Sequence, residues 1–118
     1  MSQAQTAFNA DLEDCIDNCA ECHRVCVETM QYCLRMGGKH ADLAHIRLLN
    51  DCVQICQVNA DFMIRASELH GETCAACARI CSRCAEACTA FGPDDDQMQE
   101  CAQVCSRCAE SSNRMAGE

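Results

Sequence analysis

The chain has 118 residues, enough for one domain of ordinary size, and carries a formal net charge of −9. An acidic chain lacks the basic face that nucleic-acid binding requires, so we expect no nucleic-acid partner. Fifteen cysteines far exceed normal usage, whereas tryptophan is absent and aromatic residues make up only 3%.

The first predicted element is a helix over about residues 5–36. Its inward stripe alternates steps of three and four residues, which is the spacing of a buried face in a helical bundle. The stripe consists of Phe8, Leu12, Cys15, Cys19, Cys22, Cys26, Thr29, Cys33 and Met36. Gly37 and Gly38 follow, and glycine is the usual residue just past a helix C-terminus.

The second predicted helix covers about residues 40–65, and its stripe keeps the same phase. The stripe consists of His45, Leu49, Cys52, Cys56, Asn59, Met63 and Ala66. Two boundaries with the next helix are open: Ser67 as the cap of a helix from 68, or a helix two ended by Gly71 with Thr73 as the cap. We favour Ser67, because His70 then falls in phase with the cysteines that follow.

The third predicted helix, about residues 68–91, contains the run CAACARICSRCAEAC. Its five cysteines are separated by steps of 3, 4, 3 and 4 residues, and no glycine or proline interrupts them. They are Cys74, Cys77, Cys81, Cys84 and Cys88. The sequence after residue 91 is Gly-Pro-Asp-Asp-Asp, which ends one helix and caps the next.

The fourth predicted helix covers about residues 95–115, and its stripe is again in phase. The stripe consists of Met98, Cys101, Cys105, Cys108, Ser112 and Met115. Short connections make neighbouring helices antiparallel, so the sequence predicts an all-α fold, a single domain over residues 1–118. This domain is an antiparallel up-down four-helix bundle with a cysteine-lined core.

The cysteines could form disulfides or simply fill the core, but neither interpretation fits the pattern. Their number is odd, and a continuous helix is poorly suited to bridging its own i and i+3 or i+4 positions. Leucine or isoleucine would bury more apolar area at each position. We therefore predict metal ligands. They are Cys15, Cys19, Cys22, Cys26, Cys33, Cys52, Cys56, Cys74, Cys77, Cys81, Cys84, Cys88, Cys101, Cys105 and Cys108.

Softness and charge favour Cu(I) as the metal, with multiple ions bound. Thiolates are soft ligands, suited to Cu(I), Zn(II) and iron–sulfur clusters. Zinc with four thiolates leaves a buried charge of −2, whereas about one monovalent ion per thiolate leaves the core nearly neutral. A Cu(I) store or buffer is therefore the first hypothesis.

The alternatives are an iron–sulfur electron-transfer protein and a low-capacity copper chaperone. Bacterial ferredoxins carry C-x2-C-x2-C-x3-C-P on loops. Here the only proline, Pro93, does not follow a cysteine, and the cysteine spacings obey helix phase. We expect no enzymatic activity, since the sequence has no nucleophile–base pair beyond the thiols.

Histidine and methionine residues at the two ends of the stripes are candidate additional metal ligands or points of access. Imidazole and thioether groups bind Cu(I) more weakly than thiolate and could pass the ion inward. We favour His45 as a ligand, whereas the others fit a ligand and a filler equally well. The candidates are His45, His70, Met36, Met63 and Met98.

The N-terminal segment MSQAQTAFNADLEDC has no basic region followed by an apolar run, so we expect no secretory signal. No stretch of about 20 apolar residues is available to span a membrane. These features predict a cytoplasmic protein, in a compartment where thiols stay reduced.

The C-x3-C and C-x2-C runs on helices resemble those of the bacterial copper storage proteins, the Csp family, and the third-helix run is the most specific part. Without an export signal, the chain is similar to the cytosolic branch. The resemblance implies a core that fills with many Cu(I) ions, bound mainly by cysteine pairs, and protomers that form a homotetramer. At Thr29, Met98 and Ser112 the chain departs from the most cysteine-rich members, so we expect a somewhat lower capacity.

Overall fold

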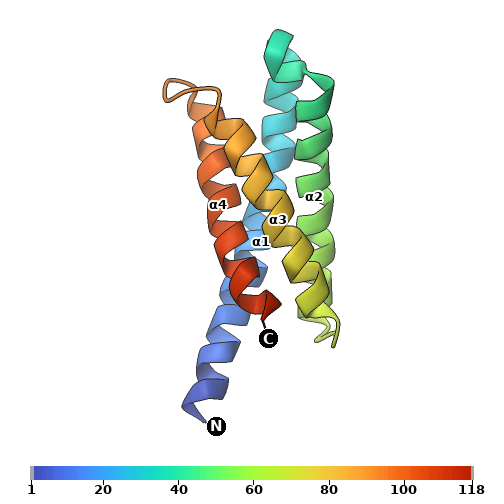
Figure 1. Cartoon of the computed structure of the whole chain (residues 1–118), viewed down its shortest axis with the longest axis vertical. Helices are drawn as coiled ribbons and strands as arrows, with labels where there is room; N and C mark the ends of the chain where they lie inside the picture. The colour runs from blue at the N-terminus through green and yellow to red at the C-terminus, as the bar shows by residue number, and fades with distance from the viewer. Residues whose placement is uncertain (1, 118) are drawn as a thin grey trace.

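The computed structural model describes residues 2–117, which form four long helices and one short 3-10 helix. The elements are α1 (Gln3–Met36), η1 (Gly38–Ala41), α2 (Leu43–Ile64), α3 (His70–Thr89) and α4 (Asp96–Ala116). The helices run alternately up and down, and short turns connect them (Figure 1). The predicted antiparallel four-helix bundle is confirmed.

Each helix packs against two neighbours, and the four close around one core. α1 lies against α2 and α4, while α3 lies against the other sides of the same two helices. α1 has 34 residues against 20 to 22 in the other helices. Its N-terminal turns therefore extend beyond the bundle, at the end where the chain also terminates (Figure 1).

The core consists largely of sulfur. All fifteen cysteines are fully buried, and few large aliphatic side chains lie among them. Leu49, Val25 and Val104 are the buried branched aliphatic residues, while Met63, Met98 and Met115 are buried towards the ends. The cysteines that the helical spacing placed on the inward faces therefore do form the core.

The predicted cap at Ser67 is wrong, because a turn occupies this position. α2 ends at Ile64, and Ala66 adopts a left-handed φ of 56°. The Ser67 amide donates to the Phe62 carbonyl at 2.9 Å and the Ala66 amide to the Met63 carbonyl at 3.0 Å. This hydrogen-bond pair is the Schellman arrangement that ends many helices.

α3 therefore begins at His70, two residues later than predicted. The Ser67 hydroxyl accepts a hydrogen bond from the Leu69 amide at 3.1 Å, so the serine stabilises the turn rather than the helix. The other boundary considered fails too, since Gly71 lies inside α3.

The remaining helix ends differ from the prediction by a few residues. The segment before α2 forms η1, so α2 starts at Leu43 rather than at 40. α3 ends at Thr89 rather than at 91. The predicted capping of α4 by aspartate holds: the Asp95 carboxylate accepts from the Met98 amide at 3.3 Å.

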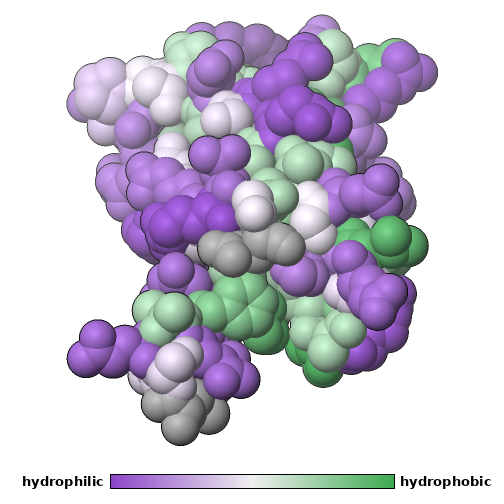
Figure 2. Space-filling model, turned by 60° about the horizontal axis from the view of Figure 1, so that its bottom comes forward, coloured by the Kyte–Doolittle hydropathy of each residue, from purple (hydrophilic) through white to green (hydrophobic). Residues whose placement is uncertain are grey.

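The outer surface is mainly hydrophilic, with hydrophobic residues in separate small groups on the face shown (Figure 2). The large apolar side chains that are exposed are Val27, Leu34, Met36, Leu43, Val58, Ile64 and Leu69. Among residues 2–117, no helix is long and apolar enough to cross a bilayer.

Candidate metal centre

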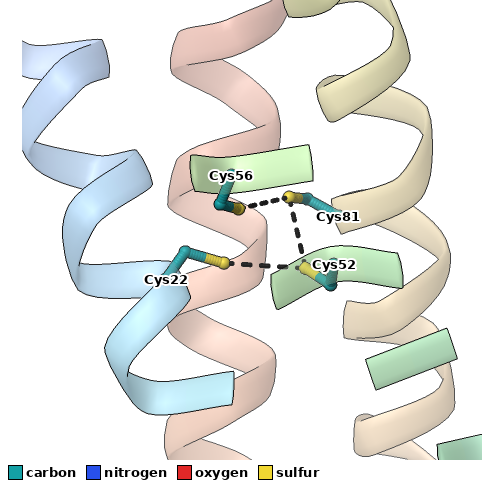
Figure 3. Close-up of side chains that lie close together, drawn as sticks. All are labelled: Cys22, Cys52, Cys56 and Cys81. Carbon is teal, nitrogen blue, oxygen red and sulfur yellow. Dashed lines mark hydrogen bonds between the residues drawn. The ribbon is translucent and has the colours of Figure 1, made fainter. Parts of the chain in front are cut away.

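Cysteine sulfurs from different helices meet in the middle of the bundle. The Cys52 and Cys81 sulfurs lie 3.5 Å apart, and Cys56 and Cys81 3.6 Å apart. Cys22 on α1 reaches Cys52 at 3.8 Å (Figure 3). Three helices thus bring thiols to one point, at separations that a bridging metal ion can draw together.

Four sets of four buried cysteines have all their sulfurs within 4.8 Å of one another. The sets are Cys22, Cys52, Cys56 and Cys81; Cys22, Cys26, Cys52 and Cys105; Cys26, Cys84, Cys101 and Cys105; and Cys56, Cys77, Cys81 and Cys108. Each set shares two cysteines with another set. We call the combined group of cysteines the thiol network, and it extends along the bundle axis rather than forming one isolated site.

The Cys88 thiol, beside this network, keeps its proton when no metal is bound. Hydrogen bonds with Cys101 and Cys84, and then burial, raise the pKa of Cys88. The network contains no lysine or arginine, since the buried polar residues are serine, threonine, asparagine and histidine. A metal ion that binds must therefore displace protons, and its positive charge replaces theirs.

Cys33, His45 and Met98 form a separate group at one end of the core. The Cys33 sulfur lies 3.6 Å from His45 Nε2 and 3.6 Å from the Met98 sulfur. Burial raises the pKa of Cys33 to about 11 and lowers the pKa of His45. A neutral imidazole is the form that binds metals, so the group offers thiol, imidazole and thioether together.

On α1 and on α2, one residue that is not a candidate ligand separates this group from the next cysteine of the inward stripe. Thr29 is between Cys26 and Cys33 on α1, and Leu49 is between His45 and Cys52 on α2; both are fully buried. The Thr29 hydroxyl donates to the Val25 carbonyl at 2.7 Å and is thereby tied to the backbone. The cysteine series of α1 and α2 are therefore interrupted at these two positions, whereas Cys84, Cys88 and Cys101 continue the thiols on α3 and α4.

At the opposite end, polar side chains mix with the last thiols. The Cys15 sulfur lies 3.6 Å from the Ser112 hydroxyl. Cys74 donates to Asn59 Oδ1 at 3.2 Å and lies 3.8 Å from the Met63 sulfur. Met63 is thus placed as a candidate thioether ligand for the Cys74 end.

Asn59 is a polar residue that the sequence analysis placed in the stripe without a role. Its Nδ2 donates to the Cys19 sulfur at 3.5 Å, and its Oδ1 accepts from the Thr73 hydroxyl at 2.8 Å. These bonds satisfy a fully buried amide and fix its orientation. Asn59 therefore lies between Cys19 and Cys74 and forms a hydrogen bond with each of them.

Aromatic and charged residues cover the Cys33 end of the bundle, and the sequence did not predict this covering role. The Phe91 ring lies 4.4 Å from the His40 ring and 5.0 Å from the His45 ring, centroid to centroid. Asp95 accepts from the Tyr32 hydroxyl at 2.9 Å and pairs with His40 Nε2 at 2.7 Å. The one available signal was the aspartate-rich turn after Gly-Pro.

The remaining candidates have different surroundings. His70 donates from Nδ1 to the Ser67 carbonyl at 3.0 Å, and its buried Nε2 has no hydrogen-bond partner in the described chain. Met36 is 55% exposed, so its predicted place in the buried stripe is wrong. It is the last residue of α1, and α2 begins only at Leu43, so Met36 lies at the rim of the bundle rather than in its core.

Comparisons with known proteins agree with this arrangement. The sequence profile of the copper storage protein family, Csp, matches residues 8–117. The uncharacterized cysteine-rich protein YhjQ of Bacillus subtilis (strain 168) is 36% identical over 85 residues, which is 72% of this chain and 79% of that protein.

Two solved structures share the fold over nearly their whole length. The Nmul_A1745 protein of Nitrosospira multiformis superposes with a TM-score of 0.85 at 39% identity, covering 92% of this chain and 97% of that one. The Cu(I)-bound copper storage protein BsCsp3 superposes with a TM-score of 0.82 at 35% identity, covering 90% and 98%. From its profile match, its relatives and its thiol-filled bundle, the chain belongs to the copper storage protein family.

Proposed function

We propose that the protein stores and buffers Cu(I) in the cytoplasm, with many ions held in the thiol network. The observation that carries this proposal is the continuity of that network: its four-cysteine sets share members along the axis. A protein that only passes on one ion needs a single accessible site. Overlapping sets of buried sulfurs can instead hold many Cu(I) ions at once.

Charge explains how a closed core can hold so many ions. Each Cu(I) that binds displaces about one proton from a thiol, so a filled core carries little net charge. Cu(I) prefers soft sulfur ligands and accepts few of them, which pairs of neighbouring thiolates provide. We expect a capacity on the order of 15 ions, about one for each cysteine.

All fifteen cysteines are proposed as ligands, with further donors at the two ends. His45 and Met98 would complete the coordination of an ion at Cys33, because both contact its sulfur. Met63 would do the same at Cys74. His70 is proposed through its unpartnered Nε2, whereas the exposed Met36 is not.

We further propose that the protein associates into homotetramers and that it binds metal rather than catalysing a reaction. The family membership supports both statements, and the exposed apolar side chains supply contact area for association. Size-exclusion chromatography with light scattering would measure the mass of the oligomer, and the mass of a monomer would contradict this part of the proposal.

An anaerobic titration of the fully reduced protein with Cu(I), in the presence of a chromophoric Cu(I) chelator, tests storage directly. We expect uptake of about a dozen ions or more before the chelator colours. Colour after one or two ions would instead indicate a copper chaperone. Neither that alternative nor an iron–sulfur protein gains support from the relatives.

A further inference from the structure

A groove of about 450 Å³ lies between α2 and α3 and reaches one of the candidate ligands. His45 lines it together with Ala44, Arg47, Asp51 and Arg83. Three other surface grooves are lined by none of the cysteines, histidines or methionines proposed above. The groove therefore connects solvent with the copper site where the others do not.

His45 joins the groove to the core. Only 9% of the residue is exposed, yet it forms part of the groove wall, while its Nε2 lies 3.6 Å from the Cys33 sulfur. An ion that binds the imidazole from the groove can therefore reach the Cys33 sulfur in a single ligand exchange. Met98 lies on the other side of that thiol.

Approach along the bundle axis is obstructed at this end. The Phe91 ring lies against both His40 and His45. Asp95 holds His40 and Tyr32 by side-chain hydrogen bonds, and these tie the α3–α4 connection to η1 and α1. The lateral groove is the approach to His45 that these contacts leave free.

The charge of the groove differs from that of the molecule. Arg47 and Arg83 are exposed and make no ion pair within the described chain, and Asp51 is the one carboxylate among the lining residues. The chain as a whole has a net charge of −9. An anion is therefore repelled by most of the surface and attracted to this groove.

We propose that this groove is the docking site for small anionic Cu(I) thiolate complexes, which deliver copper to His45 and Cys33. The proposal rests on the storage function. A Cu(I) ion held by two thiolates has an overall charge of −1 when the thiols are otherwise neutral, and added carboxylates make it more negative. Two unpaired arginines match that charge.

Transfer proceeds by ligand exchange without a change of oxidation state. One carrier thiolate leaves as His45 Nε2 binds the ion, and the Cys33 sulfur then replaces the second carrier thiolate. The Cys33 proton passes to a released thiolate, so one carrier molecule departs as thiol and the other as thiolate. The ion remains Cu(I), and the total charge is unchanged.

The test compares rates of Cu(I) uptake from two carriers under anaerobic conditions. One carrier is the anionic bis-glutathione complex, and the other is the cationic acetonitrile complex. With Arg47→Gln/Arg83→Gln we expect uptake from the anionic complex to slow at least about tenfold and to lose the decrease with ionic strength that attraction by the two arginines produces. Uptake from the cationic complex should not slow.

Arg79→Gln/Arg114→Gln is the control matched in charge, because both arginines lie outside the groove beside His45, although Arg83 lines the groove of Arg79 as well. It should leave both rates unchanged. Equal slowing by the control and the Arg47→Gln/Arg83→Gln variant would overturn the proposal, since it would indicate a general charge effect. Unchanged uptake from the anionic complex in the Arg47→Gln/Arg83→Gln variant would overturn it too.

A steric variant examines the route independently of charge. Ala44 is exposed in the groove wall, so Ala44→Phe narrows the groove without disturbing the core. We expect slower uptake from both carriers with the same number of ions at saturation. An unchanged rate here, or arginine-dependent uptake only from an acidic copper-carrying protein, would contradict the small-molecule route. A wild-type saturation of one or two ions would instead refute storage itself.

Discussion

Ser112 shows how one oxygen in place of sulfur shapes the end of the thiol network. Its hydroxyl lies 3.6 Å from the Cys15 sulfur and 4.0 Å from the Cys108 sulfur, so it occupies the place where a thiol would connect them. A serine hydroxyl is a hard, weak ligand for Cu(I). The store is therefore interrupted at a position that the fold would allow cysteine to fill.

We expect Ser112→Cys to raise the Cu(I) capacity by about one ion, because the new sulfur has two thiol neighbours. Ser111→Cys is the comparison: Ser111 is equally buried, but its hydroxyl is held by Asn18 and the Cys108 carbonyl, and Cys15 is the one thiol it contacts. Anaerobic titration of both variants measures the change. An equal gain in both would show that any added thiol counts, whatever its neighbours.

Because the pKa of Cys33 is raised, the stability of the metal-free protein should change with pH in the alkaline range. Burial raises this pKa from 9.0 to about 11, so the unfolded state loses its proton first. The free energy of unfolding should therefore be independent of this group below pH 9 and fall between pH 9 and 11. Urea unfolding of the reduced protein at several pH values would show the decline.

Cys33→Ala provides the comparison for this measurement. Its unfolding free energy should fall less steeply than that of the wild type across the same window, since one ionising thiol has been removed. Parallel curves would mean that Cys33 titrates alike in the folded and the unfolded state.

At the scale of the elements, the turn between α2 and α3 carries a residue that suits it poorly. Ala66 adopts the left-handed φ of 56° at a position where glycine is usual. The Cβ of an L-residue is crowded in this conformation, whereas glycine adopts it freely. The Schellman hydrogen bonds hold the turn despite this strain.

Ala66→Gly should therefore stabilise the metal-free protein by about 1 kcal/mol, the relief of strain exceeding the added flexibility of the unfolded chain. Ala76→Gly, in the helical interior of α3, should destabilise it by about 1 kcal/mol. Denaturant unfolding midpoints of the two variants would shift in opposite directions. A loss of stability in both would contradict the left-handed conformation at Ala66.

Much of the fold could be predicted because the cysteine spacing repeats the helical period on every element. The phase placed Cys22, Cys52 and Cys81 inward on separate helices, and the structure brings them together. The boundary at Ser67 could not be read in this way, since serine stabilises turns and helix starts alike. The three- and four-residue spacing of α1 also continues beyond the start of α2, where no neighbouring helix covers the inward face, and this is why Met36 was predicted to be buried.

The covering of the Cys33 end depends on contacts between distant parts of the chain, and no local pattern predicts it. Tyr32 and Asp95 are 63 residues apart, and His40 and Asp95 are 55 apart. The groove beside His45 likewise arises from two helices that approach each other. Sequence periodicity thus predicts which residues face the core, but not which solvent path reaches them.

At the scale of the whole molecule, the core is weak in apolar anchors and rich in ligands. Metal that binds only the folded protein must stabilise it, by about 4 kcal/mol for a site with free ion a thousandfold above its dissociation constant. We expect the melting temperature to rise stepwise with added Cu(I) equivalents. Calorimetry or circular dichroism of samples loaded to increasing extents would measure this.

The triple variant Cys77→Ala/Cys81→Ala/Cys84→Ala is the control for the thermal shift. It removes thiols of three of the four-cysteine sets, so its melting temperature should respond less to copper. A rise equal to that of the wild type would place the stabilising ions elsewhere, and no rise in the wild type would contradict binding in the folded core.

The interruption of the cysteine series at Thr29 and Leu49 has a consequence for the order in which ions leave. On α1 and α2 these two residues separate the proposed copper position at Cys33 from the thiol network, so the connection to it runs past Cys84 and Cys101 on α3 and α4. On the proposed route through the groove beside His45, the last ion to arrive is the first that can leave. Such a store has two residence times: its newest ion is quickly available to the cell, while its oldest ions form a long-lived reserve.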